Sequence, residues 1–325
     1  MSRSKITRYG EIARIRMAMA FPLRWVNSYA LRGEDGYTIV DPGPRSAENE
    51  SAWDEAFEEL GIAPEQIASI VLTHHHPDHY GLAGWLQQRS GAQVWMSGRA
   101  GEAASRSWSA AGHDEATVDL YRCHGMAEER LAELPEHLAG FIAQVEPQPE
   151  VSIIEDGLPI RFGGRLWQPV ETGGHAEGHL SFYEESSGII LCGDAVLPRI
   201  SPNISYGPQG DPQPLRSYLD GLRALGKLNV SQAFPGHRDP FEGFAERTRQ
   251  LLDHHEQRLD EMERRLHGEP KTAYEVCVSQ FGDSLGIHQL RFALSETIAH
   301  LVELEARGRA AKQSKNRFIF WSAAA

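Results

Sequence analysis

The chain has 325 residues, of which 41% are hydrophobic and 24% are charged, as expected for one large globular domain plus a smaller one. Its 32 Lys and Arg residues against 45 Asp and Glu residues give a formal net charge of −13, a field that repels nucleic acid. The three cysteines, Cys123, Cys192 and Cys277, lie far apart, so we expect neither a disulfide framework nor a Cys-rich metal site.

The N-terminal segment contains basic residues but no unbroken apolar stretch long enough for a signal peptide. No run in the chain approaches the roughly 18 apolar residues of a membrane-spanning helix. We therefore expect a cytoplasmic protein without membrane contact.

The first elements predicted along the chain are a hairpin and a helix. Residues 25–43 alternate apolar and polar positions around the turn Gly33-Glu34-Asp35-Gly36, which predicts two paired strands. Residues 46–60 have helical spacing of their apolar side chains, and Gly61 is expected to end that helix.

The next segments alternate between strands and helices. Residues 67–73 (IASIVLT) predict a buried strand, residues 81–89 a helix and residues 92–97 another strand. Residues 99–146 lack this alternation and predict a helical insertion. Five apolar runs then predict further strands: VSIIED, LPIRF, LWQPVET, HLSFYEE and GIILCGD. This order favours an α/β fold, an αββα sandwich with two sheets between helices.

The last part of the chain is mostly helical. Residues 213–225 and 243–267 predict helices on either side of the strand-like QAFPGH, and the apolar face of the second fits either the core or a homodimer surface. Two short helices and a final strand, RFIFWS, are typical of a small winged-helix module. We therefore expect a catalytic domain in residues 1–245, and a linker helix with a winged-helix-like module in 246–325.

The segment THHHPDH, residues 73–79, concentrates coordinating side chains at the end of a predicted strand. Residues two apart in an extended chain point the same way, so His74 and His76 are placed to address one metal ion. Asp78 and His79 follow a proline turn and address a position beside it. The spacing therefore supports two adjacent metals.

Three further turns each supply a ligand type: Gly-Gly-His175, Cys-Gly-Asp194 and Pro-Gly-His237. Each follows an apolar strand and a glycine, which allows a close approach of the backbone. The combination of these turns with the histidine-rich loop makes a surface histidine cluster a poor explanation.

In this order the residues resemble the signature of the metallo-β-lactamase superfamily, over residues 15–240. The resemblance implies that His74, His76 and His175 bind one metal, that Asp78, His79 and His237 bind the second, and that Asp194 bridges both. It implies two Zn²⁺ ions, with Fe or Mn as alternatives for such a nitrogen and oxygen ligand set. No ligand position holds cysteine, so the pattern is nearer to glyoxalase-II-like hydrolases than to β-lactamases with a Cys ligand.

The resemblance also implies a reaction. A hydroxide between two metals would attack an acyl carbonyl, with Asp78 and Asp194 as the catalytic carboxylates. We expect a small ester, thioester or related acyl substrate. The alternative is a metal-dependent nuclease or phosphodiesterase acting on RNA, because the tail resembles one found on an endoribonuclease. A third hypothesis is a binding or sensor protein with structural metals, which the bridging Asp194 disfavours.

Other candidate residues leave two interpretations open. Asp41 fits either a strand-ending turn or a group that supports the metal loop, and His179 fits a supporting residue or the start of a strand better than a ligand. His75 is expected to point away from the ligands. Tyr121 and His124 contact substrate if the insertion is a lid, and otherwise belong to a plain helical cover. Loop residues expected either at the entrance or in a passive connector are Ser201, Asn203 and Tyr206.

Overall fold

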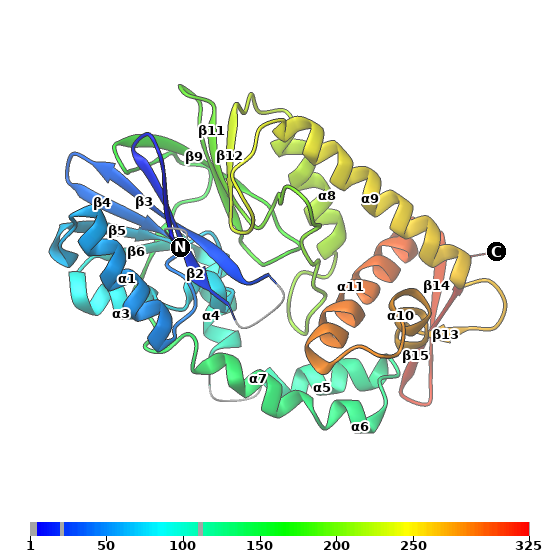
Figure 1. Ribbon diagram of the computed structural model, residues 1–325. Helices are drawn as coiled ribbons and strands as arrows, with labels where there is room; N and C mark the ends of the chain where they lie inside the picture. Colours follow the sequence, from blue (N-terminus) through cyan, green and yellow to red (C-terminus); the bar gives the residue numbers. More distant parts are fainter. Residues whose placement is uncertain (1–4, 20–22, 110–112, 325) are drawn as a thin grey trace.

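The computed structural model describes residues 5–19, 23–109 and 113–324, which contain two large β-sheets (Figure 1). In the seven-stranded sheet, β1 to β4 run antiparallel and β4 to β7 run parallel. Its strands, in spatial order, are β1 (Ile6–Tyr9), β2 (Ile12–Ala18), β3 (Trp25–Gly33), β4 (Gly36–Val40), β5 (Ile67–Val71), β6 (Gln93–Ser97) and β7 (Val151–Ile154).

The second sheet has five strands and is antiparallel except for the parallel pair β11 and β12. Its strands, in chain order, are β8 (Ile160–Phe162), β9 (Arg165–Glu171), β10 (Leu180–Glu184), β11 (Ile189–Gly193) and β12 (Gln232–Pro235). Apolar side chains of both sheets, among them Val71, Trp167 and Phe182, form one buried cluster between them. The two sheets therefore face each other.

Helices cover the outer faces of both sheets (Figure 1). The first sheet packs against α1 through Trp53 and against α3 through Leu86, and the second packs against α8 and α9. These outer elements are α1 (Ala47–Leu60), the 3₁₀ turn η1 (Pro64–Gln66), α2 (Pro77–Tyr80), α3 (Ala83–Ser90), α4 (Gly98–Ser107), α8 (Pro214–Leu225) and α9 (Phe244–Arg265). The predicted α/β class is confirmed.

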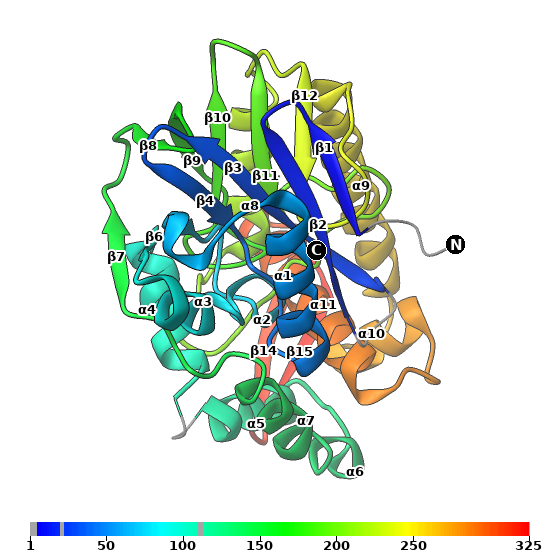
Figure 2. The same ribbon diagram turned by 60° about the vertical axis from the view of Figure 1, so that its left-hand side comes forward.

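Residues 99–146 are mostly helical, as predicted, but α4 at their start packs on the first sheet through Ala100 and Ala104 and is not part of an insertion. The helices that follow lie beside the C-terminal elements in both views (Figures 1 and 2). These helices of the insertion are α5 (His113–Cys123), α6 (Glu128–Leu131) and α7 (Leu134–Ile142), and the C-terminal elements are β13 (Lys271–Thr272), α10 (Ala273–Phe281), α11 (Ile287–Ala306), β14 (Ala310–Lys315) and β15 (Phe318–Ala323). Arg130 donates to the carbonyl of Leu285 at 2.7 Å, and the amide of Tyr274 donates to the carbonyl of His124 at 3.0 Å. These bonds join the two segments.

Several predicted elements are observed almost as expected. Gly33 and Gly36 close the β3–β4 hairpin, and α1 begins after the Ser46 cap and ends at Gly61. Strands β1 and β2 were not located individually from the sequence, and β13 and β14 were not identified. The last of these (AAKQSK) has one buried residue and otherwise faces solvent, so it carries no apolar run to mark it as a strand.

The apolar face of α9 was assigned to the core or to a dimer surface. Leu251, Leu259 and Met262 are fully buried within this chain, in a cluster that also contains Trp321 of β15. The core assignment is therefore confirmed for these side chains. In the described part of the chain, every helix is too short or too polar to span a bilayer.

Ser97 connects the end of β6 to the turn that carries His175. Its hydroxyl accepts from the amide of Ala100 at 3.1 Å, which caps α4, and donates to the buried carbonyl of Gly178 at 2.6 Å. One side chain therefore satisfies a helix end and a loop carbonyl at the same time.

We expect Ser97→Ala to lower the free energy of unfolding by about 1–3 kcal/mol, because it removes the cap and leaves a buried carbonyl unpaired. Urea unfolding measures this. The control is Ser105→Ala in the same helix, where the exposed hydroxyl donates only to Gly101. Equal losses in both variants would contradict a special role for Ser97.

Candidate metal centre

The predicted ligand residues follow the ends of strands from both sheets. The loop after β5 delivers the histidine-rich segment, in which His76 precedes α2, a single turn of helix that begins at Pro77. The turns after β9, β11 and β12 carry His175, Asp194 and His237. The sheet topology brings these four loops together at one end of the paired sheets.

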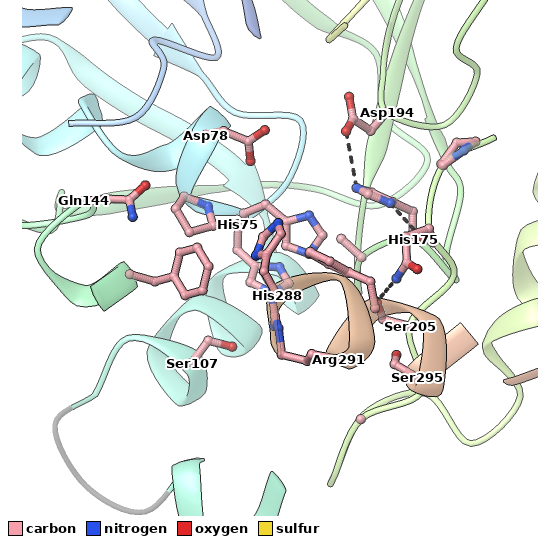
Figure 3. A pocket seen from close by; sticks show the side chains of 18 of the residues that line it. His75, Asp78, Ser107, Gln144, His175, Asp194, Ser205, His288, Arg291 and Ser295 are labelled. Carbon is pink, nitrogen blue, oxygen red and sulfur yellow. Dashed lines mark hydrogen bonds and ion pairs between the residues drawn. The ribbon is translucent and has the colours of Figure 1, made fainter. Parts of the chain in front are cut away.

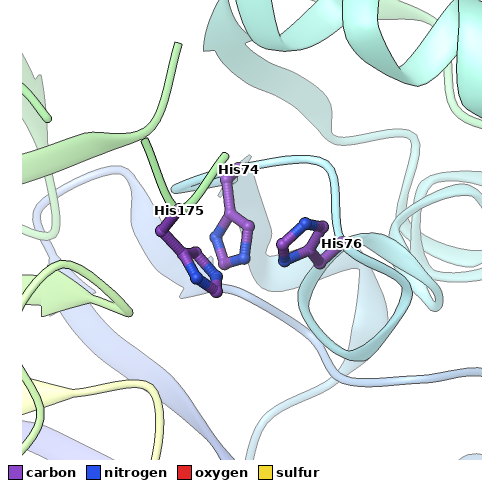
Figure 4. A group of neighbouring side chains, drawn as sticks. All are labelled: His74, His76 and His175. Atoms are coloured by element: carbon purple, nitrogen blue, oxygen red, sulfur yellow. The ribbon is translucent and has the colours of Figure 1, made fainter. Parts of the chain in front are cut away.

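The first group consists of His74, His76 and His175 (Figure 4). One ring nitrogen from each lies within 4.8 Å of the other two. The ring centroids of His74 and His76 are 4.7 Å apart, and those of His76 and His175 are 4.6 Å apart. This spacing allows three imidazoles to share one ion.

The second group consists of Asp78, His79 and His237, again with one ligand atom from each within 4.8 Å of the others. The Nε2 atom of His237 lies 3.2 Å from Oδ2 of Asp78, and Nε2 of His79 lies 3.7 Å from the same oxygen. All seven predicted ligand residues are therefore close together once Asp194 is included.

Asp194 lies between the two groups. Its Oδ1 atom is 3.5 Å from Nε2 of His79. Its Oδ2 atom is 3.5 Å from Nε2 of His175 and 3.3 Å from Nε2 of His237. One carboxylate thus faces donors of both groups, which is the position that a bridging ligand requires.

The same atoms have no hydrogen-bond partner among the described residues. Nε2 of His74, His79 and His175 and Oδ1 of Asp194 are all buried and unsatisfied. Buried polar atoms are rarely left unpaired, because desolvation costs free energy. Imidazole and carboxylate donors that converge in this way fit a divalent transition metal.

Asp41 orients two of the histidines. Nδ1 of His79 donates to Oδ2 of Asp41 at 2.8 Å. The Thr73 hydroxyl donates to the same carboxylate at 2.6 Å and accepts from Nδ1 of His74 at 2.9 Å. With their Nδ1 atoms protonated, both rings present Nε2 lone pairs to the site. Asp41 has a φ of 51°, as expected for a residue in a turn. Its hydrogen bonds show that it also supports the metal loop.

Backbone carbonyls orient two more of the five imidazoles. Nδ1 of His175 donates to the carbonyl of Asn203 at 2.8 Å, and Nδ1 of His237 donates to that of Trp25 at 3.2 Å. In both rings Nδ1 is engaged, so Nε2 is the nitrogen that can bind a metal ion. His79, Asp41 and His74 also form a close group, but the hydrogen bonds of Asp41 mark it as a supporting residue.

The two groups differ in charge. Burial and neighbouring histidines hold the pKa of His74 and His76 well below the ordinary value, which favours neutral rings with an available lone pair. Burial opposes protonation of His237, but Asp194 and Asp78 outweigh it and raise its pKa to about 10. Burial likewise opposes ionisation of Asp194, but His237 and His79 hold the pKa of its carboxyl well below the ordinary value. The second group therefore attracts a cation.

His179 is a supporting residue, as the sequence interpretation favoured. Its Nε2 accepts from the amide of Asp194 at 3.1 Å, and its Nδ1 bonds with the hydroxyl of Thr172 at 2.9 Å. Burial, followed by nearby His175, lowers its pKa to about 3. A neutral ring with both nitrogens engaged fixes the backbone of Asp194.

The remaining sequence candidates divide between the pocket and the core. His75 joins neither group of ligand residues, but it lines the pocket. Tyr121 lines the pocket as well, whereas His124 is buried and stacks on Trp321, so its suggested contact with substrate is wrong. The three loop residues expected at the entrance, Ser201, Asn203 and Tyr206, all line the pocket.

A pocket of about 860 Å³ opens over the two groups (Figure 3). Its walls come from the insertion, the loop after β11 and the C-terminal helix α11, which contributes His288, Arg291 and Phe292. These three residues were not identified from the sequence. They are far in sequence from the metal loops, and no motif marks them.

An α/β fold that places two adjacent His and Asp groups beneath a pocket defines a candidate metal-dependent hydrolase. Residues 23–237 match the family model "Metallo-beta-lactamase superfamily", and residues 259–322 match "Metallo-beta-lactamase-like, C-terminal domain". The chain therefore belongs to the metallo-beta-lactamase superfamily and is a hydrolase of that superfamily.

Three similar proteins illustrate the range of the match. A metallo-beta-lactamase family protein of Thermus thermophilus has 30% identity and a TM-score of 0.85, with 96% of this chain and 98% of that chain covered. The probable metallo-hydrolase YqjP of Bacillus subtilis (strain 168) is 28% identical over 91% of this chain and 92% of its own length. Atrochrysone carboxyl ACP thioesterase of Aspergillus fumigatus is 22% identical over 73% of this chain and 58% of its own length.

Gly236 provides a test of the site geometry. A Cβ atom at this position would lie 2.2 Å from Oδ1 of Asp194 and 2.6 Å from Cε1 of His79. We expect Gly236→Ala to displace Asp194 and to reduce the bound metal by at least one ion per chain, measured by inductively coupled plasma mass spectrometry.

The matched control is Gly140→Ala in α7, where a Cβ atom meets nothing within 4 Å. This variant should keep the full metal content. A Gly236→Ala protein with unchanged metal content would contradict the placement of Asp194 in the site.

Proposed function

We propose that this protein is a dinuclear zinc hydrolase of small esters, thioesters or related acyl compounds. The observation that carries the proposal is the position of Asp194 between two groups of three ligand residues, at the base of the 860 Å³ pocket. Fe and Mn are alternatives to zinc, because the donors are only nitrogen and oxygen. The ligand groups are His74, His76 and His175, and Asp78, His79 and His237, with Asp194 shared.

A pair of divalent ions in such a site supplies an acidified water and polarises the substrate carbonyl. The protein contributes the surroundings. Asp78 lines the pocket and is ionised, because His79 and His237 outweigh burial and lower the pKa of its carboxyl. Its carboxylate can accept a hydrogen bond from the attacking water and so orient it. This role and the bridging position make Asp78 and Asp194 the proposed catalytic carboxylates.

The pocket supports an organic substrate over a polymer backbone. Apolar side chains of several segments, including Phe141, Leu197 and Ile200, line it and offer an apolar surface to an organic group. The fungal relative named as a thioesterase supports acyl-thioester chemistry. The ligand set contains no cysteine, which supports the likeness to glyoxalase-II-like hydrolases.

We also propose that the C-terminal elements form a winged-helix module. Their order, β13, α10, α11, β14 and β15, includes two packed helices followed by an antiparallel hairpin. The module packs on the insertion and lines the pocket, which supports a role in shaping the substrate site. A winged-helix module with this role does not require a nucleic-acid ligand.

Asp194→Asn tests the catalytic assignment. The change keeps the size of the side chain but removes the charge that faces both groups, so we expect kcat to fall by about 10²-fold or more with little change in Tm. The control is Asp253→Asn at an exposed position of α9, which should keep full activity. Full activity in a fully metal-loaded Asp194→Asn protein would show that the assignment is wrong.

A substrate panel tests the reaction class. The zinc-loaded protein is assayed against acyl thioesters, aryl esters and bis(p-nitrophenyl) phosphate, with and without a chelator. We expect chelator-sensitive turnover of the acyl compounds only. Cleavage of the phosphodiester with no turnover of acyl compounds would instead support the nuclease, and metal binding without any hydrolysis would support a sensor.

A further inference from the structure

The C-terminal helix α11 presents one arginine to the pocket in an unusual setting. The guanidinium carbon of Arg291 lies over the ring of Phe292 at 4.3 Å and over the ring of Phe141 at 5.3 Å. The hydroxyl of Tyr121 donates to the backbone carbonyl of Arg291 at 3.3 Å. The aromatic contacts restrict the guanidinium, and the hydrogen bond fixes its backbone.

Arg291 differs in its charge partners from the other arginines of the pocket. Among the described lining residues there are three arginines. Arg45 pairs with Glu50 at 2.9 Å, and Arg106 pairs with Glu177 at 2.7 Å.

Within the described residues, Arg291 forms no ion pair with a carboxylate, and its buried Nε has no hydrogen-bond partner. A desolvated guanidinium carries a free-energy cost unless an acceptor satisfies its N–H groups. The two phenylalanine rings contact its faces and offer no acceptor to the buried Nε–H group at its edge. An oxyanion would satisfy this edge, because the guanidinium can donate two parallel hydrogen bonds to a carboxylate or a phosphate group.

The position of Arg291 decides which part of a ligand it meets. Figure 3 shows Arg291 on α11, on the side of the pocket away from Asp78 and Asp194. A substrate with its reacting carbonyl near the two carboxylates therefore extends its other end toward Arg291. That remote end is separated from the reacting atoms, so its charge acts on binding and specificity rather than on bond cleavage.

We propose that Arg291 binds an oxyanion of the substrate, so that the protein selects acyl esters or thioesters that carry a carboxylate or phosphate-like group at the end remote from the scissile bond. This inference rests on the proposed acyl hydrolase function. It assigns Arg291 as a specificity-determining residue, contributed by the C-terminal module to the catalytic pocket.

A matched set of three esters tests the proposal: 4-acetoxybenzoate, its neutral methyl ester and 4-acetoxyphenylphosphonate. All share the same acetyl group and differ in the para substituent of the phenol, so each ester is compared between the wild-type protein and the variant. In Arg291→Gln we expect kcat/KM for the better anionic ester to fall about tenfold or more, and that for the methyl ester to change less than about threefold. The wild-type preference between the two anions identifies the oxyanion.

Two variants serve as controls. Arg291→Lys keeps the charge but loses the planar fork, so it should restore part of the lost selectivity. Arg106→Gln removes a pocket arginine that already has a partner, Glu177, and should leave the ratio of anionic to neutral turnover unchanged. An equal loss for charged and neutral esters in Arg291→Gln, or no loss for either, would overturn the proposal.

A binding measurement distinguishes a failure of the anion site from a failure of the proposed ester hydrolysis. If the wild-type protein hydrolyses none of the three esters, the proposed ester hydrolysis fails for this class. Isothermal titration calorimetry with 4-hydroxybenzoate and 4-hydroxyphenylphosphonate then tests whether Arg291 binds an anion, without any need for turnover. Binding of either anion at least about tenfold weaker in Arg291→Gln supports the anion site, whereas equal affinity in both proteins, or no binding to the wild type, overturns it.

Discussion

The carboxylate of Asp194, held between two groups of buried imidazoles, imposes the main constraint on this structure. Its own Oδ1 atom and three imidazole nitrogens around it are buried without hydrogen-bond partners among the described residues, and cations would satisfy all four atoms. Both sheets are needed to meet the constraint, because the histidine-rich loop follows β5 of the first sheet and Asp194 follows β11 of the second. Asp41 and His179 then accept hydrogen bonds that fix the ring of His79 and the backbone of Asp194.

The C-terminal module is coupled to the metal centre through Asn203. The backbone carbonyl of Asn203 accepts a hydrogen bond from Nδ1 of His175. The side-chain amide nitrogen of Asn203, when oriented toward α11, lies 3.1 Å from the carbonyl of Phe292 and 3.2 Å from Oε2 of Glu296. The same helix lines the pocket. A module that is distant in sequence therefore both shapes the substrate site and braces a ligand residue.

Much of the fold and of the site was predictable from sequence, since the relevant signals are local. Strand-end glycines followed by His175, Asp194 and His237, together with the histidine-rich loop, identified all seven residues that the structure brings together. The part of the pocket wall that α11 contributes was not predictable. Arg291 and Phe141 meet only because the insertion packs on α11, and that contact depends on tertiary structure without a sequence periodicity. The strand β14 was missed for a different reason, namely its polar, exposed face.

The central claim is that seven side chains hold two metal ions, and metal stoichiometry tests it most directly. Inductively coupled plasma mass spectrometry of the purified protein, after dialysis against zinc and then against metal-free buffer, should give two zinc ions per chain. His76→Ala and His237→Ala, which affect different groups, should each lower this value toward one. One ion or fewer in the wild-type protein, or an unchanged content in both variants, would contradict a dinuclear site.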